Sequence, residues 1–179
     1  MENLLELLRT RRSTRSFKET QISPELVEQL MHAVLMSPSS KRSNPWQFIL
    51  VEEPGMLKSL SECKKNGGQL IDGAALAVVV IADPGCSDVW IEDVSIASLI
   101  LHLEAEDLGL GSCWVQVRGR QTADGKDSEA VVRRLLDIPE NLRVESIVAI
   151  GVKNEVKKPF DETRLQWEKV HIGKFGQAK

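Results

Sequence analysis

The chain has 179 residues, of which 42% are hydrophobic and 27% charged, as in one ordinary globular domain with a buried core. Its net charge of −3 argues against nucleic acid as the main partner, because binding along a phosphate backbone needs a broad basic surface. The apolar runs are too short to span a bilayer, acids stand where a signal peptide carries basic residues, and the three cysteines show no CxxC spacing. We therefore expect a cytoplasmic protein without a membrane segment or a disulfide framework.

Positive charge is concentrated close to the N-terminus. A short leucine-rich helix from Leu4 to Leu8 is predicted to end in residues 9–17, which hold four arginines, four hydroxyl side chains and no acid. A guanidinium grips phosphate through two parallel hydrogen bonds, and a hydroxyl can donate another. The run alone fits two interpretations, a site for a small phosphorylated ligand and a solvated basic turn.

The later elements predict an α+β domain that spans residues 1–179 as one unit, with a mixed β-sheet and helices on both faces. The unbroken apolar run over 75–82 is typical of a central strand that is covered on both faces. In chain order we expect a helix started by Ser23-Pro24 and stopped near Ser37, a strand over 46–51, a helix over 57–64, a strand over 75–82, a helix over 88–108, a strand over 112–117, a helix from Ser128 closed by Pro139, and a strand over 144–151.

The tail over residues 152–179 is polar and irregular, with isolated apolar side chains between the polar ones. Such a segment has no core of its own. We expect it to pack on something else, and a second subunit is the natural candidate.

Residues 37–48 form a second informative segment, in which a small polar loop follows a capped helix and enters a strand through Pro45-Trp46. Together with the arginine run, this segment resembles the FMN-dependent nitroreductase family, whose members carry Arg-x-Ser-x-Arg/Lys and then Pro-Ser-x-x-Asn-x-Gln-Pro-Trp-x-Phe. The resemblance continues over residues 108–115, 147–151 and 167–176. It therefore covers almost the whole chain in the expected order, and the length is similar to that of the short-chain branch.

The resemblance implies a nitroreductase-like three-layer fold and an intertwined homodimer with FMN at the subunit interface. It also implies an NAD(P)H-dependent oxidoreductase, in which FMN takes a hydride at N5 and passes electrons to a nitroaromatic, a quinone or a similar acceptor by a ping-pong mechanism. Other functions stay open: a flavin-binding or flavin-sequestering protein without turnover, a specialised member that dehalogenates or degrades flavin, and an inert dimeric domain whose arginines bind any phosphate.

The resemblance carries the cofactor site over residue by residue. Arg11, Arg12, Ser13 and Arg15 match positions that bind the phosphate and ribityl chain. For Lys157 and Lys158 a phosphate contact and a solvated basic pair are both open, while Arg9 and Lys18 are expected to be surface charges.

The remaining matched positions concern the flavin ring. Pro38, Ser39 and Ser40 match positions that reach the ring across the subunit boundary, although for Ser39 and Ser40 ordinary loop chemistry is also open. Asn44 is expected to hydrogen-bond an edge of the ring, with Arg42 in the same loop and Gln69 at the pyrimidine edge. The backbone N–H groups of Trp114, Val115 and Gln116 are candidates for N5 and O4. Arg42 departs from the family's usual Asn, and Asn44 from its usual Gln. Trp46 and Phe48 are expected to belong to the core.

No protein side chain is predicted to be catalytic, because FMN carries the chemistry. His32, His102 and His171 are isolated and show no metal-binding spacing, so no metal site is expected. The chain also lacks a G-x-S-x-G motif, a P-loop and a G-x-G-x-x-G fingerprint. The nicotinamide is therefore expected to bind as a transient substrate against the flavin.

Overall fold

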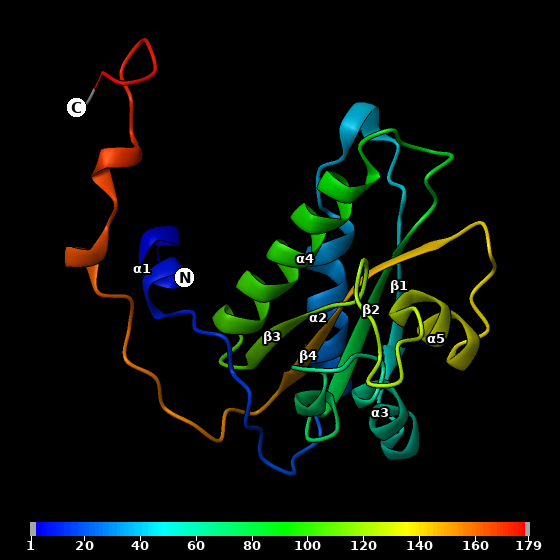
Figure 1. Cartoon of the computed structure of the whole chain (residues 1–179). Helices are drawn as coiled ribbons and strands as arrows, with labels where there is room; N and C mark the ends of the chain where they lie inside the picture. Colours follow the sequence, from blue (N-terminus) through cyan, green and yellow to red (C-terminus); the bar gives the residue numbers. More distant parts are fainter. Residues whose placement is uncertain (1–2, 178–179) are drawn as a thin grey trace.

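A computed structural model describes residues 3–177, and its centre is a four-stranded sheet (Figure 1). The strands are β1 (Trp46–Val51), β2 (Leu76–Ala82), β3 (Gly111–Gln116) and β4 (Arg143–Gly151). Their order across the sheet is β1-β2-β4-β3, and every neighbouring pair of these strands is antiparallel.

The prediction of a mixed sheet is therefore wrong for the four strands. Parallel pairing occurs only at an isolated bridge between Ser13 and Ser112, within the part of the chain that the structure describes. The apolar run of β2 indicated that both faces are covered, and both are. An unbroken apolar run is common in parallel strands, but it requires only that both faces are covered, and here helices cover both faces of an antiparallel sheet.

Helices cover both faces of the sheet, which confirms the three-layer arrangement. On one face lie α2 (Pro24–Leu35) and α4 (Trp90–Asp107), and on the other lie α3 (Pro54–Ser61) and α5 (Ser128–Leu135). Successive β2 side chains point to opposite faces, so Val78 and Val80 join the core under α2 and α4, whereas Val79 and Ile81 join the core under α3 and α5. As predicted, Trp46 and Phe48 pack against the first of these cores.

Capping residues decide where the helices begin. Ser23 caps α2, and Pro24 takes its first position, as the sequence predicted. The helix α3 begins at Pro54, three residues before the predicted start at residue 57, because Glu53 caps it: this carboxylate accepts the Gly55 N–H at 2.8 Å and the Met56 N–H at 2.6 Å.

The two ends of the chain stand apart from the three layers. The N-terminal helix α1 (Leu4–Thr10) buries none of its side chains, and Leu5 is 71% exposed. The tail runs past α1 away from the sheet, with two short turns, η3 (Glu162–Arg164) and η4 (Trp167–Lys169), and Phe175 is 92% exposed (Figure 1). In residues 3–177 no helix combines the length and the apolar character that crossing a membrane requires.

Candidate functional site

The arginine run lies between the start of β3 and the segment that continues β4. The Thr14 N–H donates to the Ser112 carbonyl at 3.0 Å, and the Asn154 N–H donates to the Ser16 carbonyl at 3.0 Å. A Cβ at position 111 would come within 2.7 Å of the Thr14 side chain, so only glycine permits this close approach. Residues 13–16 are therefore held along the sheet and do not form a loose turn.

Glu155 and Lys157, which follow β4 in the chain, also hydrogen-bond to the arginine run. A Glu155 carboxylate oxygen accepts the Arg15 N–H at 2.6 Å and the Ser16 N–H at 3.3 Å, while Lys157 Nζ donates to the Ser13 carbonyl at 2.5 Å and lies 3.1 Å from the same carboxylate. The backbone N–H of Arg15, more than Lys157, lowers the pKa of Glu155. Sequence reasoning missed Glu155, because nothing local shows that it faces a segment 140 residues away.

Several cations gather on this side of β3. Burial raises the pKa of the Cys113 thiol, and the positive charges of Arg15, Lys157 and Arg11 act against that rise, so all three lie within electrostatic reach of one buried atom. Within residues 3–177 the side chains of Arg11 and Arg12 make no hydrogen bond or ion pair, whereas Arg9 pairs with Glu6 at 2.6 Å.

Arg12 also lines two neighbouring hollows beside the run. The smaller one, of about 280 Å³, is shared with Thr14 and Lys157, and the larger one, of about 840 Å³, is shared with Lys158 and the start of the tail. The predicted cations Arg11, Arg12, Arg15 and Lys157 thus come together, and Lys158 lies at the margin.

The outer edge of β3 provides backbone donors beside these cations. The Ser112 carbonyl is bonded to the Thr14 N–H on the outer side, and the Val117 N–H is bonded to the Glu145 carbonyl on the β4 side. Because bonding directions alternate along an antiparallel strand, Trp114 and Gln116 direct their N–H groups to the outer edge, and Val115 directs its own toward β4. Of the three ring contacts predicted on β3, only Trp114 and Gln116 have a backbone N–H that faces the outer edge, where a ligand could accept it.

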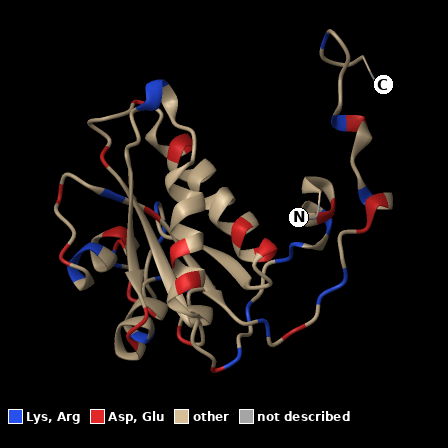
Figure 2. Cartoon of the chain, turned by 180° about the vertical axis from the view of Figure 1, so that it is seen from behind, with Lys and Arg blue, Asp and Glu red and all other residues tan. Residues whose placement is uncertain are grey.

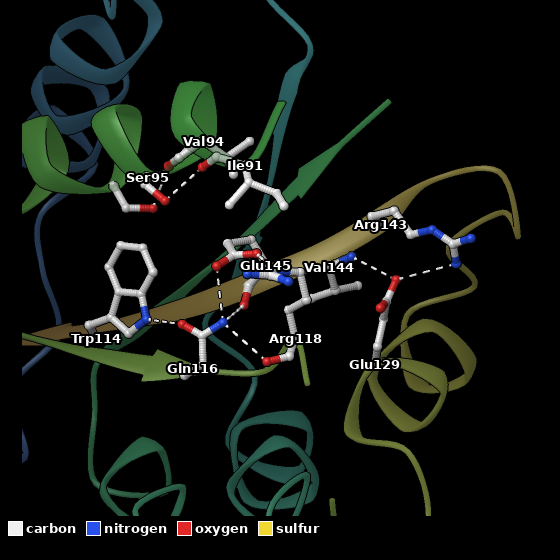
Figure 3. Close-up of polar contacts among 11 residues, drawn as sticks. Ile91, Val94, Ser95, Trp114, Gln116, Arg118, Glu129, Arg143, Val144 and Glu145 are labelled. Atoms are coloured by element: carbon white, nitrogen blue, oxygen red, sulfur yellow. Dashed lines mark hydrogen bonds and ion pairs between the residues drawn. The ribbon is translucent and has the colours of Figure 1, made fainter. Parts of the chain in front are cut away.

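The Gln116 side chain is engaged in a network of its own (Figure 3). Its carbonyl oxygen accepts the Trp114 indole N–H at 2.8 Å, and its amide nitrogen donates to a Glu145 carboxylate oxygen at 3.0 Å. Arg118 Nε donates to the other oxygen of Glu145 at 2.6 Å. This network fixes the Trp114 ring and the end of β3.

We expect Glu145→Gln to lower the free energy of unfolding by about 1–3 kcal/mol, because its new amide group must face another donor, either Gln116 or Arg118. The Glu145 side chain is buried, so water cannot take over the lost bond. Urea unfolding compares this variant with Glu140→Gln at an exposed position. Equal midpoints for Glu145→Gln, Glu140→Gln and the unchanged chain would contradict the role given to the network.

A buried histidine lies beneath the site. His102 Nδ1 is 2.7 Å from the Ser112 hydroxyl, and its ring stacks near Trp114 with centroids 6.3 Å apart. Burial and, to a smaller degree, the charge of Arg11 lower its pKa to about 4. The neutral imidazole thus connects α4 to the strand that holds the arginine run, a role that its isolated position in the sequence did not indicate.

This pKa predicts how stability depends on pH. Between its ordinary value of 6.5 and about 4, the unfolded chain binds a proton at residue 102 that the folded chain does not bind. Stability therefore falls as the pH is lowered through this window, by about 3 kcal/mol in total. His102→Asn should flatten this part of the stability curve in urea unfolding, whereas the exposed control His32→Asn should leave it unchanged. If the unfolding free energy of His102→Asn fell with pH between 6.5 and 4 as steeply as that of the unchanged chain, the prediction would be contradicted.

The second sequence element lies at the other end of α4. The turn η1 (Ser40–Arg42) is held there because the Ser40 N–H donates to Asp93, in the first turns of α4, at 2.8 Å. The arginine run lies beside the C-terminal end of α4 (Figure 1). A helix of 18 residues is about 27 Å long. One chain therefore does not bring residues 38–44 to the arginines.

Gln69 is also apart from the cations. Its side chain accepts the Gly67 N–H at 2.9 Å and lies in a hollow of about 700 Å³ between α3 and α5. None of the residues that line this hollow lines those beside Arg12. In the described chain no three His, Cys, Asp or Glu side chains are grouped as a metal site would need.

Comparisons with known proteins point to one family. Residues 8–81 match the model of the Nitroreductase family. A provisionally named NADH dehydrogenase/NAD(P)H nitroreductase of Archaeoglobus fulgidus is 36% identical over 98% of this chain and 100% of its own length. The solved structure of an FMN-dependent nitroreductase from Clostridium difficile R20291 superposes with a TM-score of 0.93 at 40% identity, over 96% of this chain and 100% of that one. A structure from Parabacteroides distasonis gives a TM-score of 0.88 at 26% identity, over 98% of this chain and 100% of that one.

Proposed function

Because the chain belongs to the nitroreductase family, we propose that it is an FMN-dependent oxidoreductase that uses NADH or NADPH to reduce a nitroaromatic, a quinone or a similar acceptor. The observation that carries the proposal is the group of cations beside β3. The side chains of Arg11 and Arg12 make no hydrogen bond or ion pair among residues 3–177. Arg15 and Lys157 act on the same Cys113 thiol as Arg11, and Lys157 shares a hollow with Arg12. These side chains suit the doubly charged phosphate of FMN, which proteins bind through charge-assisted hydrogen bonds.

The flavin ring would lie along the outer edge of β3. There the N–H groups of Trp114 and Gln116 point away from β4, and donors of this kind suit the polar edge of the ring. When bound, FMN supplies the redox chemistry by taking a hydride from the nicotinamide and passing electrons to the acceptor in a second half-reaction. The protein itself would bind FMN, orient the ring against the substrate and shield it from water. No side chain needs to transfer a proton.

The second sequence element would reach the site only from another copy of the chain. Within one chain, residues 38–44 lie at the far end of α4 from the arginine run, about 27 Å of helix away. We therefore propose a homodimer in which the partner's Ser39, Ser40 and Asn44 complete the site. The exposed apolar side chains of α1 and of the tail would be covered by the same partner.

Separated half-reactions test this proposal. The protein is treated with NADH or NADPH without oxygen, freed of nicotinamide by gel filtration, and then given a nitroaromatic. We expect the filtered protein to reduce a stoichiometric amount of the acceptor. A protein that binds flavin but reduces nothing after filtration would support a sequestering role and contradict the proposed one.

A further inference from the structure

The loop at the N-terminal end of α4 has an unusual backbone that is firmly held. Lys41, Arg42 and Asn44 have φ angles of 52°, 57° and 45°, in the left-handed region that residues with a Cβ rarely occupy. Such a conformation persists only where the surroundings impose it.

Two contacts impose it here. The Ser39 hydroxyl accepts the Asn44 N–H at 2.9 Å and donates to the Asn44 side-chain oxygen at 2.7 Å, which closes the loop on itself. The buried carboxylate of Asp93 accepts the Ser40 N–H at 2.8 Å with one oxygen and the Ser87 hydroxyl at 2.7 Å with the other, which fixes the loop to α4. The loop is therefore ordered before any ligand binds.

The same geometry presents two positive charges to solvent. The side chains of Lys41 and Arg42 are exposed, and within residues 3–177 neither makes a hydrogen bond or an ion pair. Figure 2 shows this basic turn as the blue segment at the upper left, above the three layers and far from the arginine run. The unpaired guanidinium of Arg42 suits a carboxylate or a phosphate group of a ligand.

We propose that Arg42, supported by Lys41, selects substrates that carry an additional anionic group, either a carboxylate on the electron acceptor or the 2′-phosphate of NADPH. The inference rests on the proposed function, in which the partner's loop borders the site. The phosphate of FMN is already matched by four cations of the other chain, Arg11, Arg12, Arg15 and Lys157, and a further charge at the ring end is free to act on substrates. A fixed loop gives this selection without an ordering cost when the substrate binds.

The test measures two ratios of kcat/KM in the flavin-loaded protein. One compares 4-nitrobenzoate with the neutral 4-nitrobenzamide, and the other compares NADPH with NADH. Arg42→Gln should lower at least one ratio by about fivefold, the effect of one exposed ion pair of about 1 kcal/mol. The ratio that falls identifies the source of the anion. Added salt should lower the same ratio in the unchanged protein, because it screens the pair.

Two further variants separate charge from folding. Arg42→Lys keeps the charge and should keep most of the selectivity, whereas Arg134→Gln removes an exposed arginine from α5, on the opposite face of the sheet, and should change neither ratio. A yellow, active Arg42→Gln protein with both ratios unchanged would overturn this inference alone. A colourless protein that reduces neither probe would overturn the proposed function and this inference with it.

Discussion

Replacing Arg11 with alanine is expected to weaken FMN binding by about tenfold to a hundredfold, because a hydrogen bond to a charged group contributes about 1.5–3 kcal/mol. The Arg11 side chain makes no hydrogen bond or ion pair in the described chain, and the bond from its backbone N–H to the Leu7 carbonyl at 2.9 Å is kept in alanine, so the variant should still fold. Titration of the flavin-free protein with FMN, followed by fluorescence quenching, gives the dissociation constant of each variant.

Arg9→Ala is the matched control for this prediction. Arg9 belongs to the same run, but its guanidinium is bonded to Glu6 at 2.6 and 2.8 Å. Its removal should leave FMN binding unchanged. If Arg11→Ala bound FMN as tightly as the unchanged chain, or if both variants lost the same affinity, the phosphate site would not be where we place it.

Removal of residues 160–179 is expected to convert the proposed dimer into a monomer and to release its flavin. Leu165, Ile172 and Phe175 are among the exposed apolar side chains of the tail. Burying each of them contributes about 1.5–3 kcal/mol, so their combined loss removes most of the free energy that holds a dimer together. Sedimentation at micromolar concentration and the absorbance of bound flavin measure the two effects.

Full-length variants distinguish the apolar contacts from the length of the tail. Replacing Leu165, Ile172 and Phe175 together with serine should have the same effect as the truncation, whereas Lys169→Gln with Lys174→Gln should leave the dimer intact. A truncated chain that remains a flavin-loaded dimer would show that the tail does not hold the subunits together.

Most of the fold follows from short-range patterns in the sequence. The cap Ser23-Pro24 and the apolar runs predicted the start of α2 and the strands β1 and β2 to within a residue. Strand direction was predicted wrongly, because an apolar run reports only that both faces are buried. The start of α3 was missed because the capping carboxylate of Glu53 was not recognised beside Pro54.

The candidate site was predictable only in part. Four phosphate candidates, Arg11, Arg12, Arg15 and Lys157, do come together, although Lys157 lies 144 residues after Ser13, the residue of the run to which it is bonded. A resemblance to a family places such residues on a common site, whereas local pattern cannot. A local sequence pattern also cannot reveal hydrogen-bond partners that are distant in the chain, and for this reason the contacts of Glu155 and His102 were not predicted.

The loop over residues 38–44 shows the same limit. Its polar composition predicted an irregular connection, but nothing in Lys41, Arg42 or Asn44 indicated three left-handed backbone conformations. That geometry is held by the hydrogen bonds between Ser39 and Asn44 and by the buried Asp93 on α4, which lies far from the loop in the sequence. The family resemblance placed Gln69 at the ring, whereas the structure puts it in a hollow apart from the cations, so its contact with flavin stays a prediction.

The absorption spectrum of the purified protein tests the central claim most directly. We predict a yellow protein whose flavin band is bleached by NADH or NADPH without oxygen and restored by a nitroaromatic or a quinone. A colourless protein that takes up no added FMN, or a yellow one whose band neither nicotinamide bleaches, would contradict an FMN-dependent oxidoreductase.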